Sequence, residues 1–171
     1  MLTYQPQCDP YNEIFRILSL LYFDKNKQFN LDVLKILDFY FLFPQFITDI
    51  KLPKEMVSYR SQFKKYESPY AVQGTKKQLF DNLDVYQCMA IDTLVAKKII
   101  NTEYYQKNII FLNEQIDIAP YLDQQLEQRN SDNQELLDFL VNKLSKIHFW
   151  GENGLKARTG LMEYRYDEII L

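Results

Sequence analysis

Few side chains in this sequence could do chemistry, and those few are far apart. His148 is the only histidine, and neither Cys8 nor Cys88 lies in a recognisable nucleophile motif. A Ser-His-Asp or Cys-His device would have to use His148, which stands just before a glycine turn. We interpret it as a structural or surface imidazole at a helix end. Zinc would need several more Cys or His ligands than the chain can bring together, so we expect no metal site.

Nucleotide and carboxylate chemistry are no better represented. With four glycines in total, neither GxGxxG nor GxxxxGK[ST] can be written. Asp123 and Glu127 are paired carboxylates, but two acids four residues apart on an acidic helix normally form a solvated face. We therefore expect no enzyme activity and no cofactor.

Composition predicts one globular domain, or one domain with an appended helical piece. Apolar residues make up 47% of the 171, which is enough for a sizeable core. Tyr and Phe are abundant, which is typical of interfaces but also of proteins from an AT-rich genome. Two distant thiols indicate a reducing compartment, and the first residues lack the pattern of a signal peptide. The longest uncharged apolar run, Phe39 to Phe43, is too short to span a bilayer, so we predict a cytoplasmic protein without a membrane contact.

Charge is unevenly distributed along the chain. The net charge is −3, which argues against autonomous tight binding to nucleic acid. From Lys51 to Lys77, seven Lys and Arg face two acids, a local +5, whereas residues 113–138 carry seven acids and Arg129, a local −6. The basic stretch is either a solvated face or a contact surface for a partner or for DNA. Its candidate contact residues are Lys54, Arg60, Lys64, Lys65, Lys76 and Lys77.

Two helices should open the chain. Asp9 followed by Pro10 predicts a helix to about Phe23, because Asp caps a helix well and Pro is favoured in its first turn. After a polar turn, Asn30 can cap a second helix that runs through Leu42. This second helix is apolar nearly all round, which is typical of a central element.

Asp38 is the odd residue within that apolar run. A carboxylate in a buried helix needs a partner, and Arg16 of the first helix is the nearest candidate by pattern. We predict that Arg16 and Asp38 form a structural pair.

The middle of the chain predicts several helices and then a strand. We expect a short helix at 45–50, an exposed basic helix at 54–66 and a loop at 68–75. A short helix at 76–83 should follow, and then a helix at 85–100 that is capped by Asp84 and buries Met89. A strand or β-wing is expected near 105–112. A helix that runs directly into a β-ribbon is the layout of a winged helix, although many small α+β domains share that order. The exposed face of this helix would offer Tyr86, Gln87, Asp92 and Thr93, which suits protein binding better than reading DNA.

The C-terminal part predicts a long acidic helix over 121–147, with an apolar stripe that weakens between Arg129 and Asn133. The fold class is therefore α+β and mostly α, with a helical N-terminal half, a winged-helix-like unit and this long acidic helix. We divide the chain into a helical, winged-helix-like domain at 1–113 and an acidic helical extension at 114–171 that packs on it.

Several residues resemble a known family. They are Tyr4-x-Pro6-x-x-Asp9-x-Tyr11, Phe15-Arg16, the run from Leu34 to Pro44, and Leu52-Pro53. This pattern resembles the middle component of bacterial ABC three-component systems, a subunit that Lamassu-type defence operons contain. The resemblance extends to about Asn113, and the run from Ile36 to Pro44 is its most specific part.

The resemblance implies a winged-helix-like accessory subunit without catalytic residues. It would bridge an SMC-like ABC ATPase that senses foreign DNA and a separate effector, often a nuclease, and would meet DNA only through the complex. The family's commonly basic positions around the second helix are here Asp32 and Lys35, which puts a DNA role there in doubt. The main alternative is a winged-helix transcription regulator, which would need a symmetric dimer and a basic recognition helix. A small hydrolase, the third hypothesis, lacks the necessary residues.

Overall fold

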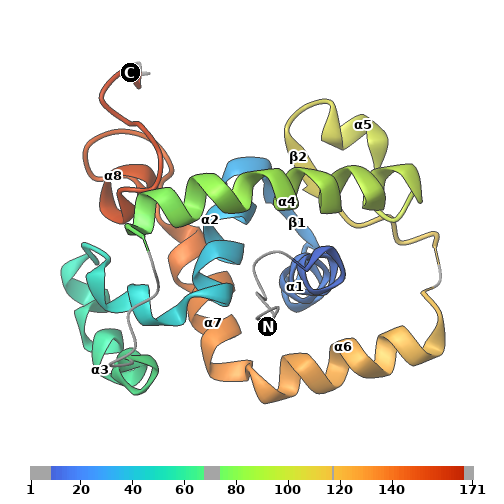
Figure 1. The fold of residues 1–171 in the computed structure, drawn as a ribbon, viewed down its shortest axis with the longest axis horizontal. Helices are drawn as coiled ribbons and strands as arrows, with labels where there is room; N and C mark the ends of the chain where they lie inside the picture. The colour runs from blue at the N-terminus through green and yellow to red at the C-terminus, as the bar shows by residue number, and fades with distance from the viewer. Residues whose placement is uncertain (1–8, 68–73, 117, 168–171) are drawn as a thin grey trace, which may run out of the picture.

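The computed structural model describes residues 9–67, 74–116 and 118–167, and these are mostly helical with one small sheet (Figure 1). Tyr4, Pro6 and Cys8 and most of the expected loop at 68–75 lie outside the described residues. The α-helices are α1 (Pro10–Phe23), α2 (Leu31–Leu42), α3 (Arg60–Phe63), α4 (Lys76–Ala96), α5 (Thr102–Tyr105), α6 (Pro120–Asp132), α7 (Gln134–Asn142) and α8 (Leu155–Thr159). The 3₁₀-helices are η2 (Pro44–Asp49), η3 (Lys54–Tyr59), η4 (Lys64–Tyr66) and η5 (Leu144–Lys146), and the strands are β1 (Gln28–Asn30) and β2 (Ile109–Phe111).

The first two helices begin at the caps that the sequence predicts. The Asp9 carboxylate accepts hydrogen bonds from two amides of the first turn of α1, at 3.0 and 3.3 Å. The Asn30 side chain does the same for α2, at 2.9 and 3.4 Å. Each cap satisfies amides that have no partner inside the helix, which stabilises a helix by about 1 kcal/mol. Both predicted helices are confirmed.

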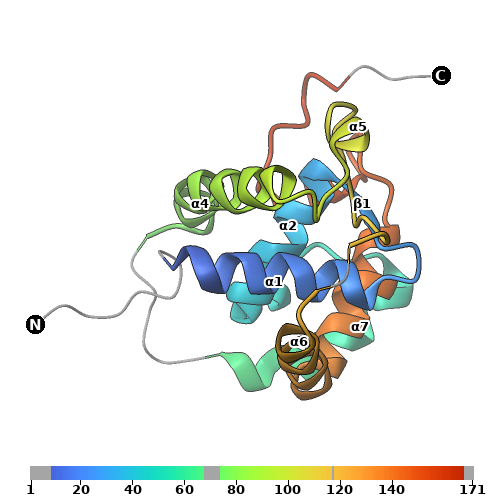
Figure 2. The same cartoon turned by 90° about the vertical axis from the view of Figure 1, so that its right-hand side faces the viewer.

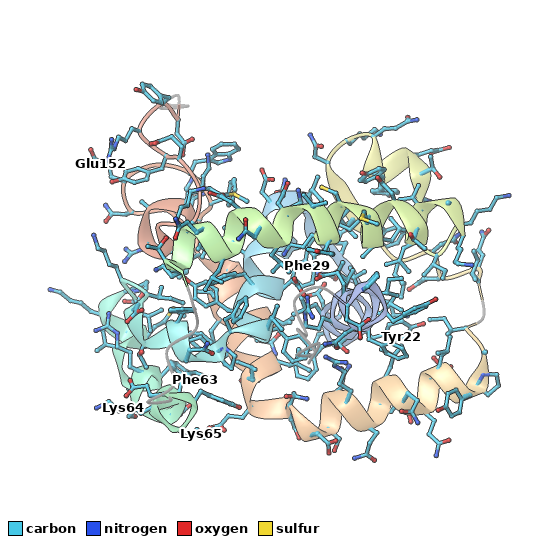
Figure 3. All side chains as sticks on the ribbon, viewed as in Figure 1. Tyr22, Phe29, Phe63, Lys64, Lys65 and Glu152 are labelled. Carbon is cyan, nitrogen blue, oxygen red and sulfur yellow. The ribbon has the colours of Figure 1, made fainter. Side chains whose placement is uncertain are left out.

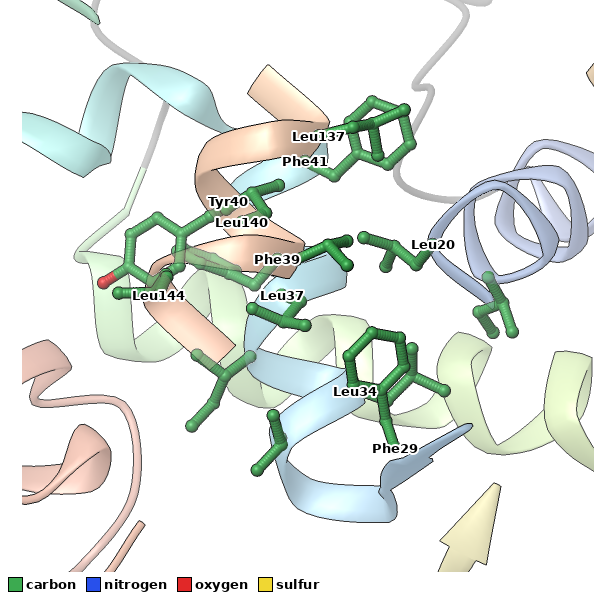
Figure 4. Packing of buried hydrophobic residues seen from close by; sticks show 14 of the residues in the cluster. Leu20, Phe29, Leu34, Leu37, Phe39, Tyr40, Phe41, Leu137, Leu140 and Leu144 are labelled. Atoms are coloured by element: carbon green, nitrogen blue, oxygen red, sulfur yellow. The ribbon is translucent and has the colours of Figure 1, made fainter. Parts of the chain in front are cut away.

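Helix α2 is the centre of the fold. Every residue from Val33 to Phe41 is buried, and α1, α4 and α7 pack around the helix. In Figure 4, Leu20 of α1 and Leu137 and Leu140 of α7 approach α2 from different sides. Complete burial of one such side chain contributes about 1.5–3 kcal/mol. An all-round apolar helix is therefore stable only because three other helices cover it.

A two-stranded antiparallel sheet joins distant parts of the chain. Phe29 of β1 lies opposite Ile110 of β2, and a single bridge between Ile100 and Leu112 continues the pairing. The sequence predicts β2, but the prediction of a polar turn at residues 24–30 was wrong for β1. Polar residues flank Phe29 on both sides, so this strand depends on its partner strand and not on its own composition.

Helix α4 differs most from its prediction. It is one helix from Lys76 to Ala96 and not two, because Thr75 supplies a capping box. Asp84, which we expected to cap a second helix, instead forms an ion pair with Lys35 of α2 at 2.7 Å. Met89, expected inside, is 53% exposed, and Gln87, expected outside, is fully buried.

The segment after α2 is also more irregular than predicted. Residues 54–66 form η3, α3 and η4 in succession and not one exposed helix, and Met56 and Phe63 are buried.

The predicted helix at 121–147 is divided. Helix α6 ends at Asp132 and α7 begins at Gln134, so the break falls within the segment where the apolar stripe weakens. Leu126 is the buried residue of α6, which packs across α1 (Figure 2). Within the described ranges, no helix is long and apolar enough to cross a membrane.

Candidate functional site

A group of charged and polar side chains is buried between α1, α2 and α4. It consists of Glu13, Arg16, Asp38 and Gln87, each at most 1% exposed, and we refer to it as the buried charge cluster. Arg16 Nε donates to Asp38 Oδ1 at 2.7 Å, and Arg16 Nη2 also pairs with Glu13. Gln87 Nε2 donates to Asp38 Oδ2 at 2.8 Å and to the Lys35 carbonyl at 3.0 Å. The structure thus brings Arg16 and Asp38 together and adds two residues to them.

One guanidinium in this cluster serves two carboxyl groups. Burial raises the pKa of Glu13 to about 9, and repulsion from Asp38 adds to that effect while attraction to Arg16 opposes it. Glu13 therefore holds a proton at neutral pH, and Arg16 and Asp38 remain as one oppositely charged pair. A neutral cluster is far less costly to bury than one with an excess charge.

Sequence reasoning missed Glu13 and Gln87 for different reasons. Glu13 lies in the first turn of α1, where an acid usually faces water because it interacts well with the helix dipole. Its spacing of three residues from Arg16 was an available signal. Gln87 was expected on the open face of its helix, and only the long, continuous course of α4 turns it inward.

The six candidate contact residues of the basic stretch have different surroundings. Lys65 pairs with Glu135 of α7, and Lys77 pairs with Asp81 of its own helix. Lys54 and Lys64 are exposed, and Lys64 and Lys65 lie at the outer edge of the 54–66 segment (Figure 3). Two of the predicted contacts are therefore already engaged within the molecule.

Arg60 and Lys76 belong to a different group, which a C-terminal residue completes. Arg60 is partly buried and donates from Nη2 to the Ile50 carbonyl at 2.6 Å. Arg158 of α8 donates from Nη1 to the next carbonyl, that of Lys51, at 2.7 Å. The Lys51 amide in turn donates to the Arg158 carbonyl at 3.0 Å. No signal in the sequence indicates that Arg158 lies beside Lys51, because 107 positions separate them.

We refer to Lys51, Arg60, Lys76 and Arg158 as the basic surface. Burial lowers the pKa of Lys76. Repulsion from Lys51 lowers this pKa further, whereas attraction to Asp49 raises it. Thus the ammonium groups of Lys51 and Lys76 lie close enough to repel each other. Within the described ranges, no member of the basic surface forms an ion pair with a carboxylate.

Helix α8 is held in place by a network that fixes the position of Arg158. Lys156 Nζ lies 2.5 Å from Asp167 Oδ1 and 4.1 Å from the centre of the Trp150 ring. The helix ends at Gly160, whose φ of 66° favours a residue without a side chain. Arg158 is therefore presented from a well-anchored element.

The remaining chemistry-bearing residues lie apart from one another. His148 is exposed, and Cys88 is a free thiol beside Lys35 Nζ at 3.4 Å. An open cleft of about 370 Å³ between α1, α2 and α6 is lined by Phe15, Phe41 and Arg129, and the Arg129 guanidinium lies 5.5 Å from the centre of the Phe41 ring. Among the described residues, no group of three or more His, Cys, Asp or Glu side chains could hold a metal ion.

Comparison with known proteins identifies one family. The family described as "ABC-three component (ABC-3C) system Middle Component 5" matches residues 2–167. The match continues beyond Asn113, where the resemblance in the sequence ended, and so includes α6, α7 and α8. No curated protein and no solved structure matches the chain.

Proposed function

The chain belongs to the Middle Component 5 family of ABC three-component systems, and on this premise we propose that it is a non-catalytic accessory subunit that bridges an SMC-like ABC ATPase and an effector. The observation that carries the proposal is the length of the family match, which spans residues 2–167. We further propose that the system is a cytoplasmic, Lamassu-type defence complex and that its effector is a nuclease.

The order of elements supports a winged-helix-like arrangement in the first 113 residues. Helix α1, strand β1 and helix α2 precede α4, and β2 then returns to pair with β1. The Ile100–Leu112 bridge closes the loop that contains α5. In this arrangement α4 has the position of a recognition helix and the segment around α5 has that of the wing.

The exposed face of α4 favours a protein partner over DNA bases. Val85 is 61% exposed and Met89 is 53% exposed, and one helical turn separates them. Apolar side chains in this position suit a protein contact, whereas base reading would use Arg, Asn or Gln. Gln87, which could have read a base, is committed to Asp38 inside the fold. The transcription-regulator alternative is correspondingly weaker.

Reconstitution of the complex tests this function. The chain should copurify with an ATPase and an effector encoded beside it, and they should elute together in size-exclusion chromatography. Val85→Glu combined with Met89→Glu should remove one partner while the melting temperature stays nearly constant. Gln124→Glu combined with Ser131→Glu, a pair of exposed positions on α6, is the matched control and should leave assembly intact.

Two results would contradict the proposal. Failure of the wild-type chain to assemble with either neighbour would exclude a bridging role. Hydrolysis of ATP or cleavage of plasmid DNA by the isolated chain, abolished by one substitution in it, would exclude a non-catalytic role.

A further inference from the structure

Cations from four separate segments converge at the basic surface. Arg60 and Arg158 bind the carbonyls of two consecutive residues, Ile50 and Lys51, from different parts of the chain. Lys76, at the start of α4, lies within range of repulsion from Lys51. Asp49 is the carboxylate that attracts Lys76.

The contacts of the two arginines fix their positions without neutralising their charge. Arg158 Nε and Nη1 donate to the carbonyls of Asn153 and Lys51, at 2.6 and 2.7 Å. A carbonyl oxygen is a neutral acceptor, so each guanidinium keeps its full positive charge, and Arg60 Nε is buried without a hydrogen-bond partner among the described residues. Guanidinium groups with free donors bind phosphate through paired hydrogen bonds.

The position of Lys76 is unfavourable for the isolated fold. The first turn of a helix favours acids because of the helix dipole, yet the first turn of α4 contains no acid. Lys77 compensates by pairing with Asp81, whereas Lys76 forms no ion pair with any residue that the structure describes. A local arrangement that opposes stability is expected where a charged ligand offsets it.

We propose that the basic surface formed by Lys51, Arg60, Lys76 and Arg158 binds the phosphate backbone of duplex DNA within the assembled complex. This inference rests on the proposed function, since the chain's net charge of −3 opposes tight binding on its own. Phosphate contacts need no base-reading side chains, which agrees with the apolar face of α4. The guanidinium groups can bind phosphate oxygens through paired, charge-assisted hydrogen bonds.

A matched pair of double variants tests the proposal. Lys51→Gln with Lys76→Gln removes two positive charges from the basic surface. Lys65→Gln with Lys77→Gln removes the same charge from two lysines that are already paired with carboxylates. Arg60 and Arg158 are left unchanged because they hold the backbone at Ile50 and Lys51.

Binding of a fluorescent duplex to the assembled complex should be measured by anisotropy across a series of salt concentrations. Each lost phosphate contact lowers the slope of log affinity against log salt by about one unit. We expect a slope about two units shallower for Lys51→Gln with Lys76→Gln and at least about tenfold weaker binding near 0.1 M salt. The control variant should retain the wild-type slope.

The other outcomes each overturn the proposal. Equal weakening in both variants would indicate a general charge effect, and unchanged binding in both would exclude DNA contact while leaving the bridging function intact. Loss of assembly in Lys51→Gln with Lys76→Gln alone would identify an acidic protein face instead. If the wild-type complex does not form, the bridging function fails, and the DNA contact proposed within that complex fails with it.

Discussion

The buried charge cluster and the basic surface use the same kinds of side chain under opposite conditions. In the cluster, the guanidinium of Arg16 is enclosed by the carboxyl groups of Glu13 and Asp38. In the basic surface, Arg60 and Arg158 donate to carbonyls, and no carboxylate among the described residues forms an ion pair with them. A buried ion without a partner costs several kcal/mol, whereas an exposed ion costs little. The comparison teaches that charges paired inside the protein maintain the fold, while charges left unpaired outside are available to another molecule.

Removing one member of the buried pair should have the largest effect on stability. Asp38→Ala removes the carboxylate that pairs with the buried Arg16 guanidinium, so we expect a loss of roughly 3 kcal/mol in the free energy of unfolding. Urea denaturation of Asp38→Ala, Arg16→Ala and the double variant measures the interaction between the two residues. Strictly additive losses would show that the pair contributes nothing jointly.

A smaller loss of stability is expected for Arg60, which belongs to the basic surface but is partly buried. Arg60 is charged and partly buried, but its acceptor is the neutral Ile50 carbonyl. Arg60→Ala should lower the free energy of unfolding by about 1.5–3 kcal/mol, because it removes a hydrogen bond to a charged donor. Lys64→Ala, four residues further on and exposed, is the control. Equal melting temperatures for the two variants would mean that the Arg60 contact is unimportant.

Glu13 offers a test that depends on pH. Its pKa is raised from 4.5 to about 9 on folding, so between these values the folded protein binds one more proton than the unfolded chain. The stability contributed by protonated Glu13 is therefore fully present below about pH 4.5 and is lost as the pH rises to about 9. Glu13→Gln cannot titrate and should lack this loss, so the variant gains on the wild type as the pH rises. Parallel stability curves from pH 5 to pH 9 would exclude a proton on Glu13.

The smallest effect on stability should come from the exposed lysines. Lys51→Gln and Lys64→Gln should each change the free energy of unfolding by less than about 0.5 kcal/mol. Thermal melts at low and high salt check this expectation. A loss above about 1 kcal/mol for Lys51→Gln would indicate that the basic surface contributes to the fold.

Local signals explain what could be predicted from the sequence. The caps Asp9 and Asn30 act on amides only two or three residues away, so α1 and α2 begin where expected. The pairing of Arg16 with Asp38 followed from a general rule, since a carboxylate in a buried helix needs a partner and Arg16 was the nearest candidate by pattern.

Features that depend on distant contacts could not be predicted. Strand β1 exists because residues 109–111 pair with it, and polar side chains on both sides of Phe29 conceal that role. The six candidate contact residues were chosen because they are neighbours in sequence, so they included Lys65 and Lys77 and omitted Arg158. Only the fold shows that the first two already have carboxylate partners and that the third lies beside Lys51. Whether the basic surface binds a partner or DNA stays a prediction.

The central position of α2 also has a consequence for biosynthesis. Its apolar surface is covered partly by α1, which is translated before it, and partly by α7, which begins at Gln134. At about 5–20 residues per second, a ribosome needs roughly 5–18 s to make the 91 residues between Leu42 and Gln134. During that interval one side of the most hydrophobic helix has no cover from its own chain. We expect the nascent protein to need a chaperone or an early-binding partner subunit, and a chain truncated before α7 to aggregate.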